Sequence, residues 1–211
     1  MMKYDTYLPI GCDCIPAYYL KQWGLRTEAY PLDWMGFSSS TMIHLFETGF
    51  SDYFSVFAEE EPYWKSTCRY IRDTANDILS VHHFPLNQEI SDVLEGFHAT
   101  MRKRYLRVNS RLMNSHTLLM LGSHQETEEQ LEDSLIRFSR LYPHLTIRLV
   151  NVHHCENMTS LEYRQRQRDV NDHLTMICFY LNNQRDTVNN KHFDIWGNEE
   201  LWNRFVAAEC K

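Results

Sequence analysis

The sequence predicts a mixed α/β protein: one domain with a central, partly parallel sheet flanked by helices. Short β-rich segments alternate with segments whose apolar residues recur every three or four positions, a mixture typical of this class. In the C-terminal half, residues 117–152 show strand, capped helix and strand at the spacing of a parallel βαβ unit. The 211 residues suffice for one domain, with the motifs at 1–86 and a long helix plus the βαβ unit at 87–211.

The first elements are a strand and two helices. An apolar, β-rich segment at residues 4–10 predicts a strand that runs into a glycine. Pro16 suits the first turn of the helix that follows, and Gly24 suits its C-terminal cap. The serines at 38–40 can cap a second helix at 41–48.

The middle of the chain predicts a loop, a hairpin and a long helix. Residues 52–64 are aromatic and acidic, and we expect a loop with local structure there. Two β-rich segments at 67–71 and 78–82 flank a polar turn, which is the pattern of a hairpin. Apolar residues then recur at helical spacing over residues 87–113.

The C-terminal half predicts the βαβ unit and further helix. Residues 117–121 indicate a buried strand, Thr127 caps a helix that reaches about Tyr142, and 145–152 indicate the second strand. We expect residues 159–183 to be helical, or helical with a strand at 176–181. The segment 193–208, with Trp196 and Trp202, closes the chain.

Composition excludes several classes of protein. The formal charge of −7 argues against a general affinity for nucleic acid or an anionic membrane. No apolar segment is long enough to span a bilayer, and the N-terminus lacks the apolar segment of a signal peptide, so we expect a cytoplasmic protein. The six cysteines are scattered and include no Cys-x-x-Cys pair, which predicts reduced thiols and no structural zinc module.

Two of the thiols, Cys12 and Cys14, lie where the first strand meets the first helix. Unpaired amides and the positive end of the helix dipole stabilise a thiolate at such a position, which lowers the thiol pKa. Cys14 is therefore a candidate nucleophile, although a buried, inert cysteine would show the same pattern. Cys12 is the alternative reactive thiol, or the two pair in redox or metal chemistry.

Two histidine doublets are candidates for a site. His82 ends a strand ahead of Pro85 and suits a general base, or else a packed histidine, while His83 should face the other way with a structural role. His153 and His154 follow the carboxyl end of a parallel strand, where ligands often bind. Cys14, His82 and His153 could together hold zinc, but no spacing requires it, and we expect no metal or cofactor.

The remaining candidates are charged. Asp33, between Leu32 and Trp34, could orient a histidine or could cap local backbone N–H groups. Arg107 and Arg111 share a helix face, which either is simply solvated or binds a phosphate or carboxylate. No glycine-rich phosphate loop accompanies them.

Three motifs resemble the bacterial family called putative papain-like cysteine peptidases. The family's Gly-x-x-Cys-x-x-Ala opening matches residues 11–17, and its Tyr-Pro-Phe-Asp-Trp motif matches 30–34 with leucine at the third position. Its His-Asp-Phe motif matches 82–84, where a second histidine replaces the acid, and weaker similarity extends over most of the chain. The resemblance implies a nucleophile at Cys14, a general base at His82 and a carboxylate at Asp33.

The first functional hypothesis is a cysteine-dependent hydrolase or acyltransferase for a peptide or small acyl substrate, with no nucleic-acid or membrane partner. The second is a non-hydrolytic α/β protein that binds or transfers a phosphorylated or nucleotide-sugar ligand. In that case Arg107, Arg111, His153 and His154 would hold the anionic group. The third is an inactive family member with a binding role, because the acid beside His82 is missing. The sequence does not indicate the oligomeric state.

Overall fold

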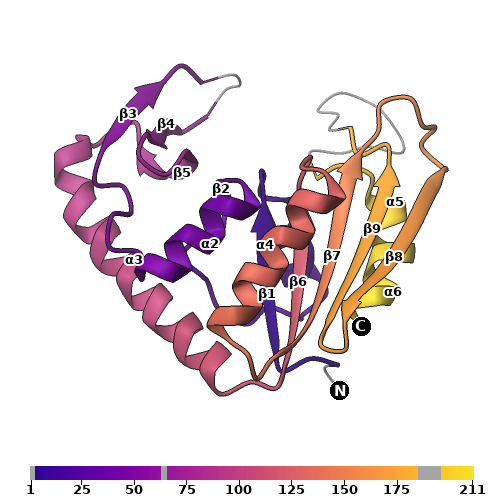
Figure 1. Cartoon of the computed structure of the whole chain (residues 1–211). Helices are drawn as coiled ribbons and strands as arrows, with labels where there is room; N and C mark the ends of the chain where they lie inside the picture. Colours follow the sequence, from indigo (N-terminus) through magenta and orange to yellow (C-terminus); the bar gives the residue numbers. More distant parts are fainter. Residues whose placement is uncertain (1–2, 63–65, 185–195) are drawn as a thin grey trace.

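The computed structural model describes residues 3–62, 66–184 and 196–211, and these residues form two sheets (Figure 1). Sheet A has the order β1-β6-β7-β9-β8, in which the first four strands are parallel and β8 is antiparallel. Sheet B is antiparallel, with the order β2-β5-β4-β3. The strands of sheet A are β1 (Thr6–Gly11), β6 (Thr117–Ser123), β7 (Thr146–His154), β8 (Tyr163–Asn171) and β9 (Leu174–Leu181). Those of sheet B are β2 (Met35–Gly36), β3 (Phe57–Glu60), β4 (Cys68–Asp73) and β5 (Ile78–Pro85).

The mixed α/β class is thus confirmed, and so is the parallel βαβ unit, which consists of β6, α4 and β7. The helices are α1 (Ile15–Gln22), α2 (Ser39–Thr48), α3 (Ile90–Met113) and α4 (Glu128–Leu141), followed near the C-terminus by α5 (Glu199–Leu201), the π-helical η1 (Trp202–Val206) and α6 (Ala207–Cys210). Sheet B lies wholly within residues 1–86, whereas sheet A takes β1 from that part and its other strands from 87–211.

Local capping sets the predicted helix ends. The hydroxyl of Ser38 accepts the Thr41 N–H at the start of α2, and α2 ends at Gly49 in the left-handed region. At the start of α4, Thr127 and Gln130 form a reciprocal capping box. Pro16 occupies the first turn of α1, as expected.

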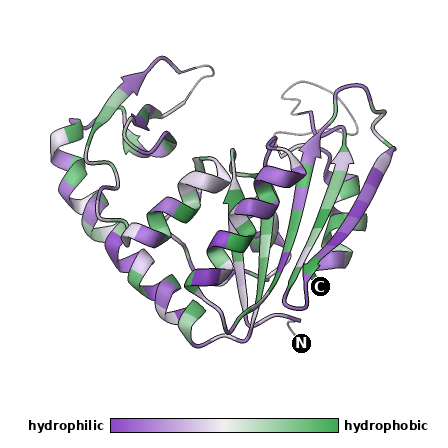
Figure 2. Ribbon diagram, viewed as in Figure 1, coloured by the Kyte–Doolittle hydropathy of each residue, from purple (hydrophilic) through white to green (hydrophobic). Residues whose placement is uncertain are grey.

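Sheet A is covered on both faces because its buried strands are apolar throughout. Along β6, Leu118 and Met120 pack into the core that contains α2, α3 and α4. Leu119 and Leu121 point the other way and pack with α1 and with Trp202 of the C-terminal helices. Figure 2 shows apolar residues along the central strands and a mostly polar outer strand, β8.

Two sequence-based predictions were wrong. Residues 163–171, expected to be helical, form strand β8, which pairs antiparallel with β9; only the alternative strand at 176–181 is confirmed, within β9. The alternation of arginine and glutamine in β8 suits an edge strand, because charged side chains there discourage pairing with another chain. The expected loop at 52–64 contains strand β3, although Tyr63 and Trp64 lie outside the described residues, as do 193–195.

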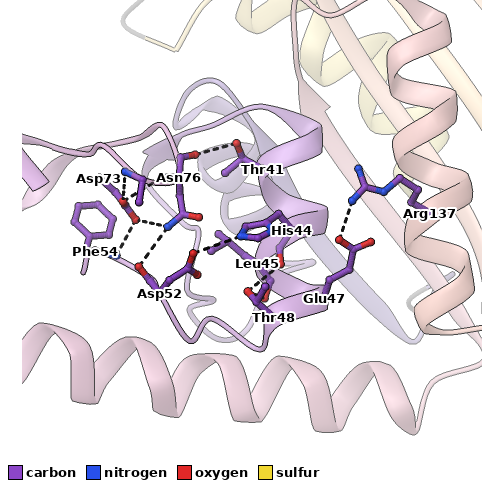
Figure 3. Close-up of polar contacts among 11 residues, drawn as sticks. Thr41, His44, Leu45, Glu47, Thr48, Asp52, Phe54, Asp73, Asn76 and Arg137 are labelled. Atoms are coloured by element: carbon purple, nitrogen blue, oxygen red, sulfur yellow. Dashed lines mark hydrogen bonds and ion pairs between the residues drawn. The ribbon is translucent and has the colours of Figure 1, made fainter. Parts of the chain in front are cut away.

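Polar contacts tie helix α2 to sheet B and to helix α4, which packs on sheet A (Figure 3). The hydroxyl of Thr41 donates to the carbonyl of Asn76 in the β4–β5 turn, at 3.0 Å. On the other side of the helix, Glu47 pairs with Arg137 of α4 at 2.7 Å. The turn is itself organised by the buried carboxylate of Asp73. Helix α2 therefore fixes sheet B against the sheet A layer.

Within the described parts of the chain, no helix combines the length and the hydrophobicity that crossing a lipid bilayer requires.

Candidate functional site

The chain passes from β1 to α1 through Gly11, Cys12, Asp13 and Cys14. Gly11 has a φ of +145°, and a Cβ there would lie 2.8 Å from the carbonyl oxygen of Ser123, so only glycine fits beside β6. The Asp13 carboxylate holds the loop, since it accepts the Ile15 N–H at 2.9 Å and the Ser123 hydroxyl at 3.1 Å.

Cys14 is the N-cap residue of α1. Its carbonyl accepts the Tyr18 N–H at 3.1 Å, while its side chain is buried and makes no capping hydrogen bond. The first turn of α1 itself carries no acidic residue, and the negative charge nearest its first amide is the Asp13 carboxylate, which accepts the Ile15 N–H. The structure thus places the buried Cys14 at the N-terminus of α1, and Cys12 two residues earlier, where the side chain is exposed.

His82 and His83 point to opposite sides of β5. The exposed His82 lies edge to face with the Trp34 indole, with 5.9 Å between ring centroids. His83 bonds through Nδ1 to the Ser80 hydroxyl and packs against Phe97 of α3. Burial, with the nearby positive charge of Arg104, lowers the pKa of His83 to about 4, so this ring is neutral and structural.

A row of aromatic rings leads from His82 to the start of α1. Trp34 contacts Trp196 at a centroid distance of 5.9 Å, and Trp196 stacks on Tyr18 at 4.1 Å. Tyr18 lies one turn after Cys14. Trp34 has a φ of +67°, in the left-handed region that a bulky residue rarely adopts. Backbone strain of this kind persists only where the surroundings enforce it, and it is common at functional sites.

Asp33 helps to hold the backbone of Trp34 in this conformation. Its buried carboxylate lies 2.5 Å from the Arg26 guanidinium and accepts the Tyr30 N–H at 2.8 Å. Burial raises the pKa of Asp33 to about 6, although Arg26 and the Tyr30 N–H act in the opposite direction. Of the two interpretations of Asp33, these contacts fit the one in which it caps local backbone and holds the turn before Trp34.

The candidate anion-binding residues lie at opposite edges of sheet A. Arg107 and Arg111 both pair with Glu28, at 2.7 Å and 3.0 Å, and line an open pocket beside Asp5 and His116, which precede β1 and β6. The two histidines of the second doublet instead end β7 at the carboxyl edge. The structure therefore does not bring the four residues together into one anion site.

Both histidines of the second doublet, His153 and His154, have hydrogen-bond partners. His153 stacks on Tyr180 at 4.7 Å and bonds through Nε2 to the Asn151 amide at 3.1 Å, and burial lowers its pKa. His154 accepts the Asn183 N–H through Nδ1 at 2.9 Å. Across the described ranges 3–62, 66–184 and 196–211, no three His, Cys, Asp or Glu side chains are arranged to hold a metal ion, so the Cys14, His82 and His153 zinc trio is not assembled.

At the carboxyl end of β6 lies a pair that was not predicted from the sequence, formed by the buried His124 and the partly exposed Glu126. His124 bonds through Nδ1 to Glu126 at 2.9 Å, and Glu126 also accepts the N–H and the hydroxyl of Ser39. The position of His124 in the sequence could have indicated it, because His124 directly follows a parallel strand and ligands favour the carboxyl ends of such strands.

Fold and site together define an α/β protein with a thiol at the junction of its first parallel strand and first helix. The family described as putative papain-like cysteine peptidase matches residues 5–205, and the chain belongs to this family. Comparisons with curated proteins and with solved structures found no match.

Proposed function

We propose that the protein is a cysteine-dependent hydrolase or acyltransferase that acts on a peptide or a small acyl substrate. The observation that carries the proposal is the position of Cys14 as the N-cap of α1, at the positive end of that helix. Membership of the peptidase family supports the same assignment.

In the proposed mechanism, His82 takes the proton of the Cys14 thiol and the thiolate attacks the substrate carbonyl carbon. The new C–S bond forms a tetrahedral intermediate, whose collapse breaks the bond to the leaving group, and the His82 imidazolium protonates that group. Water, or another acceptor, then attacks the thioester and restores the thiol.

The first turn of α1 can supply an oxyanion donor. The Ile15 N–H is taken by Asp13, Pro16 has none, and the Tyr18 N–H is taken by the carbonyl of Cys14. The Ala17 amide remains for a developing oxyanion, since no acceptor for it is found among the described residues.

The histidine at position 83 weakens the case for an inactive protein. Its side chain faces α3, on the side of β5 away from the exposed His82. An acid at that position would also face away, so its loss removes no group from beside the His82 ring. A reducing compartment such as the cytoplasm suits the proposal, because all six cysteines, each within the described residues, are thiols.

Alkylation mapped to individual cysteines tests the proposal. Iodoacetamide should modify Cys14 at pH 6, where an ordinary thiol with a pKa of about 8.5 is mostly protonated. The His82→Gln variant should slow this reaction about tenfold, whereas Cys12→Ala, a matched control two residues away, should leave it unchanged. If total labelling is the same in the wild type and in Cys14→Ala, the activated thiol is not Cys14.

A further inference from the structure

A groove of about 510 Å³ opens between sheet B and the carboxyl edge of sheet A. Cys12 and His124 line it on the sheet A side, and Gly36 and Arg72 line it on the sheet B side. Gly36 allows a close approach, since a Cβ there would lie 2.7 Å from the Cys12 carbonyl oxygen. The groove therefore reaches the loop that carries the exposed Cys12 side chain.

Strand register brings Cys12 and His124 together. The last paired residues of β1 and β6 are Gly11 and Ser123, and the Cys12 N–H donates to the Ser123 carbonyl at 3.0 Å. This bond continues the parallel ladder by one residue and sets Cys12 opposite His124. Opposed residues of a parallel pair project to the same face, so the thiol and the imidazole share one side of the strand ends.

His124 is held as a base would be. The backbone N–H of His124 donates to the side-chain oxygen of Asn151 at 3.0 Å, and the backbone carbonyl of His124 accepts from the side-chain NH2 of Asn151 at 3.2 Å. Its Nδ1 lies 2.9 Å from Glu126, which Ser39 fixes through its N–H at 2.8 Å and its hydroxyl at 2.7 Å. Although burial opposes it, the bonds from His124 and Ser39 lower the pKa of Glu126 to about 2.

An ionised carboxylate can only accept, so Nδ1 of His124 donates to Glu126; when the ring is neutral, this fixes the tautomer that has its lone pair on Nε2. The Nε2 atom is buried and has no hydrogen-bond partner in the described part of the chain, and His124 itself is 1% exposed. A buried ring nitrogen without a hydrogen-bond partner is a candidate for a catalytic role.

We propose that Cys12, His124 and Glu126 form a second thiol site, with Cys12 as nucleophile, His124 as base and Glu126 as the residue that orients the base. The site takes small acyl donors that carry a polar group, because Ser38, Gln125, Gln130 and the Arg72–Asp77 pair surround the groove. It goes beyond the proposed function and does not depend on Cys14.

The chemical step resembles ordinary acyl transfer. Nε2 of His124 takes the proton of the Cys12 thiol, which donates to the Ser123 carbonyl at 3.0 Å in the resting state. The thiolate forms a C–S bond with the acyl carbon, the bond to the leaving group breaks, and the imidazolium returns the proton to that group.

The test is acylation by p-nitrophenyl acetate, mapped to single cysteines in a Cys14→Ala background from pH 5 to 9. The partly exposed Cys155 serves as reference thiol in the same chain. We expect Cys12 to react about tenfold faster than Cys155 at pH 6. The His124→Asn variant should bring Cys12 down to the rate of Cys155 and move its pH profile to that of an ordinary thiol.

Glu126→Gln and Ser39→Ala should each slow the acylation of Cys12 several-fold without changing the acylation rate of Cys155. These two variants keep the proposal testable if His124→Asn does not fold. Equal rates at Cys12 and Cys155 in the parent, or a Cys12 rate that these variants do not change, would overturn the proposal. Iodoacetamide mapping of the wild type separates the two sites. A reactive Cys12 beside an inert Cys14 supports this site and refutes the Cys14 mechanism, and the reverse result refutes only this site.

Discussion

The guanidinium of Arg26 lies 2.5 Å from the carboxylate of Asp33, and the two side chains are 8% and 0% exposed. Arg26 also donates to the carbonyls of Ala17 in α1 and of Glu28. The ion pair therefore joins α1 to the turn that precedes Trp34, whose indole contacts His82. Asp33 thus influences the candidate base by holding the backbone.

Breaking this pair should be costly. Asp33→Asn or Arg26→Met should each lower the free energy of unfolding by about 3 to 5 kcal/mol, because the remaining partner stays buried without its counterpart. Urea denaturation at pH 7.5 measures the change. Arg107→Ala is the control, since its partly exposed pair with Glu28 should contribute much less, about 1 kcal/mol. Similar small losses for both pairs would contradict the structural role of Asp33.

The Glu126 carboxylate should make stability depend on pH in the acid range. Its pKa is about 2 in the folded protein and is ordinarily 4.5, so its contribution is complete above pH 4.5 and is lost as the pH falls through 2. The shift corresponds to about 3 kcal/mol. Thermal unfolding between pH 2 and 6 should show a smaller decline for Glu126→Gln than for the wild type; parallel curves would rule out this source of stability.

His83 should also make stability depend on pH, but in a higher pH range than Glu126 does. Because burial lowers its pKa from 6.5 to about 4, the folded state binds the proton less well than the unfolded chain. Stability is therefore complete above pH 6.5 and falls as the pH drops through 4, by at most about 3 kcal/mol. In His83→Phe, which keeps an aromatic ring against Phe97, unfolding between pH 4 and 7 should depend less on pH. An unchanged slope would show that His83 is not the titrating group.

Gly11 and Gly24 form a matched pair for testing the strand–helix junction. Both have positive φ, but a Cβ at Gly11 would meet the Ser123 backbone at 2.8 Å, whereas one at Gly24 would meet nothing within 4 Å. Gly11→Ala should therefore cost about 3 kcal/mol or more, and Gly24→Ala only about 1 to 2 kcal/mol. Gly11→Ala should also slow alkylation of Cys12 and Cys14, as peptide mapping can measure. Equal costs for both variants would refute the close approach.

Helices and buried strands could be predicted because their signals are local. The capping serine before α2, the Thr127–Gln130 capping box and the apolar strands of the βαβ unit each lie within a short window. Strand β8 could not be predicted, because its residues are almost all exposed and the one strand that it pairs with in the described parts of the chain is β9. A polar segment without an apolar face carries no periodicity that separates strand from helix.

In the candidate site, too, some features could be predicted from the sequence and others depend on the tertiary structure. The sequence by itself determined that Cys14 precedes a helix, that His82 and His83 face opposite sides of a strand, and which family the chain resembles. Only the tertiary structure decided that Asp33 pairs with Arg26 and that Ser39 meets Glu126 across 87 residues of chain. Such contacts depend on how separate elements pack, and local propensities carry no information about that packing.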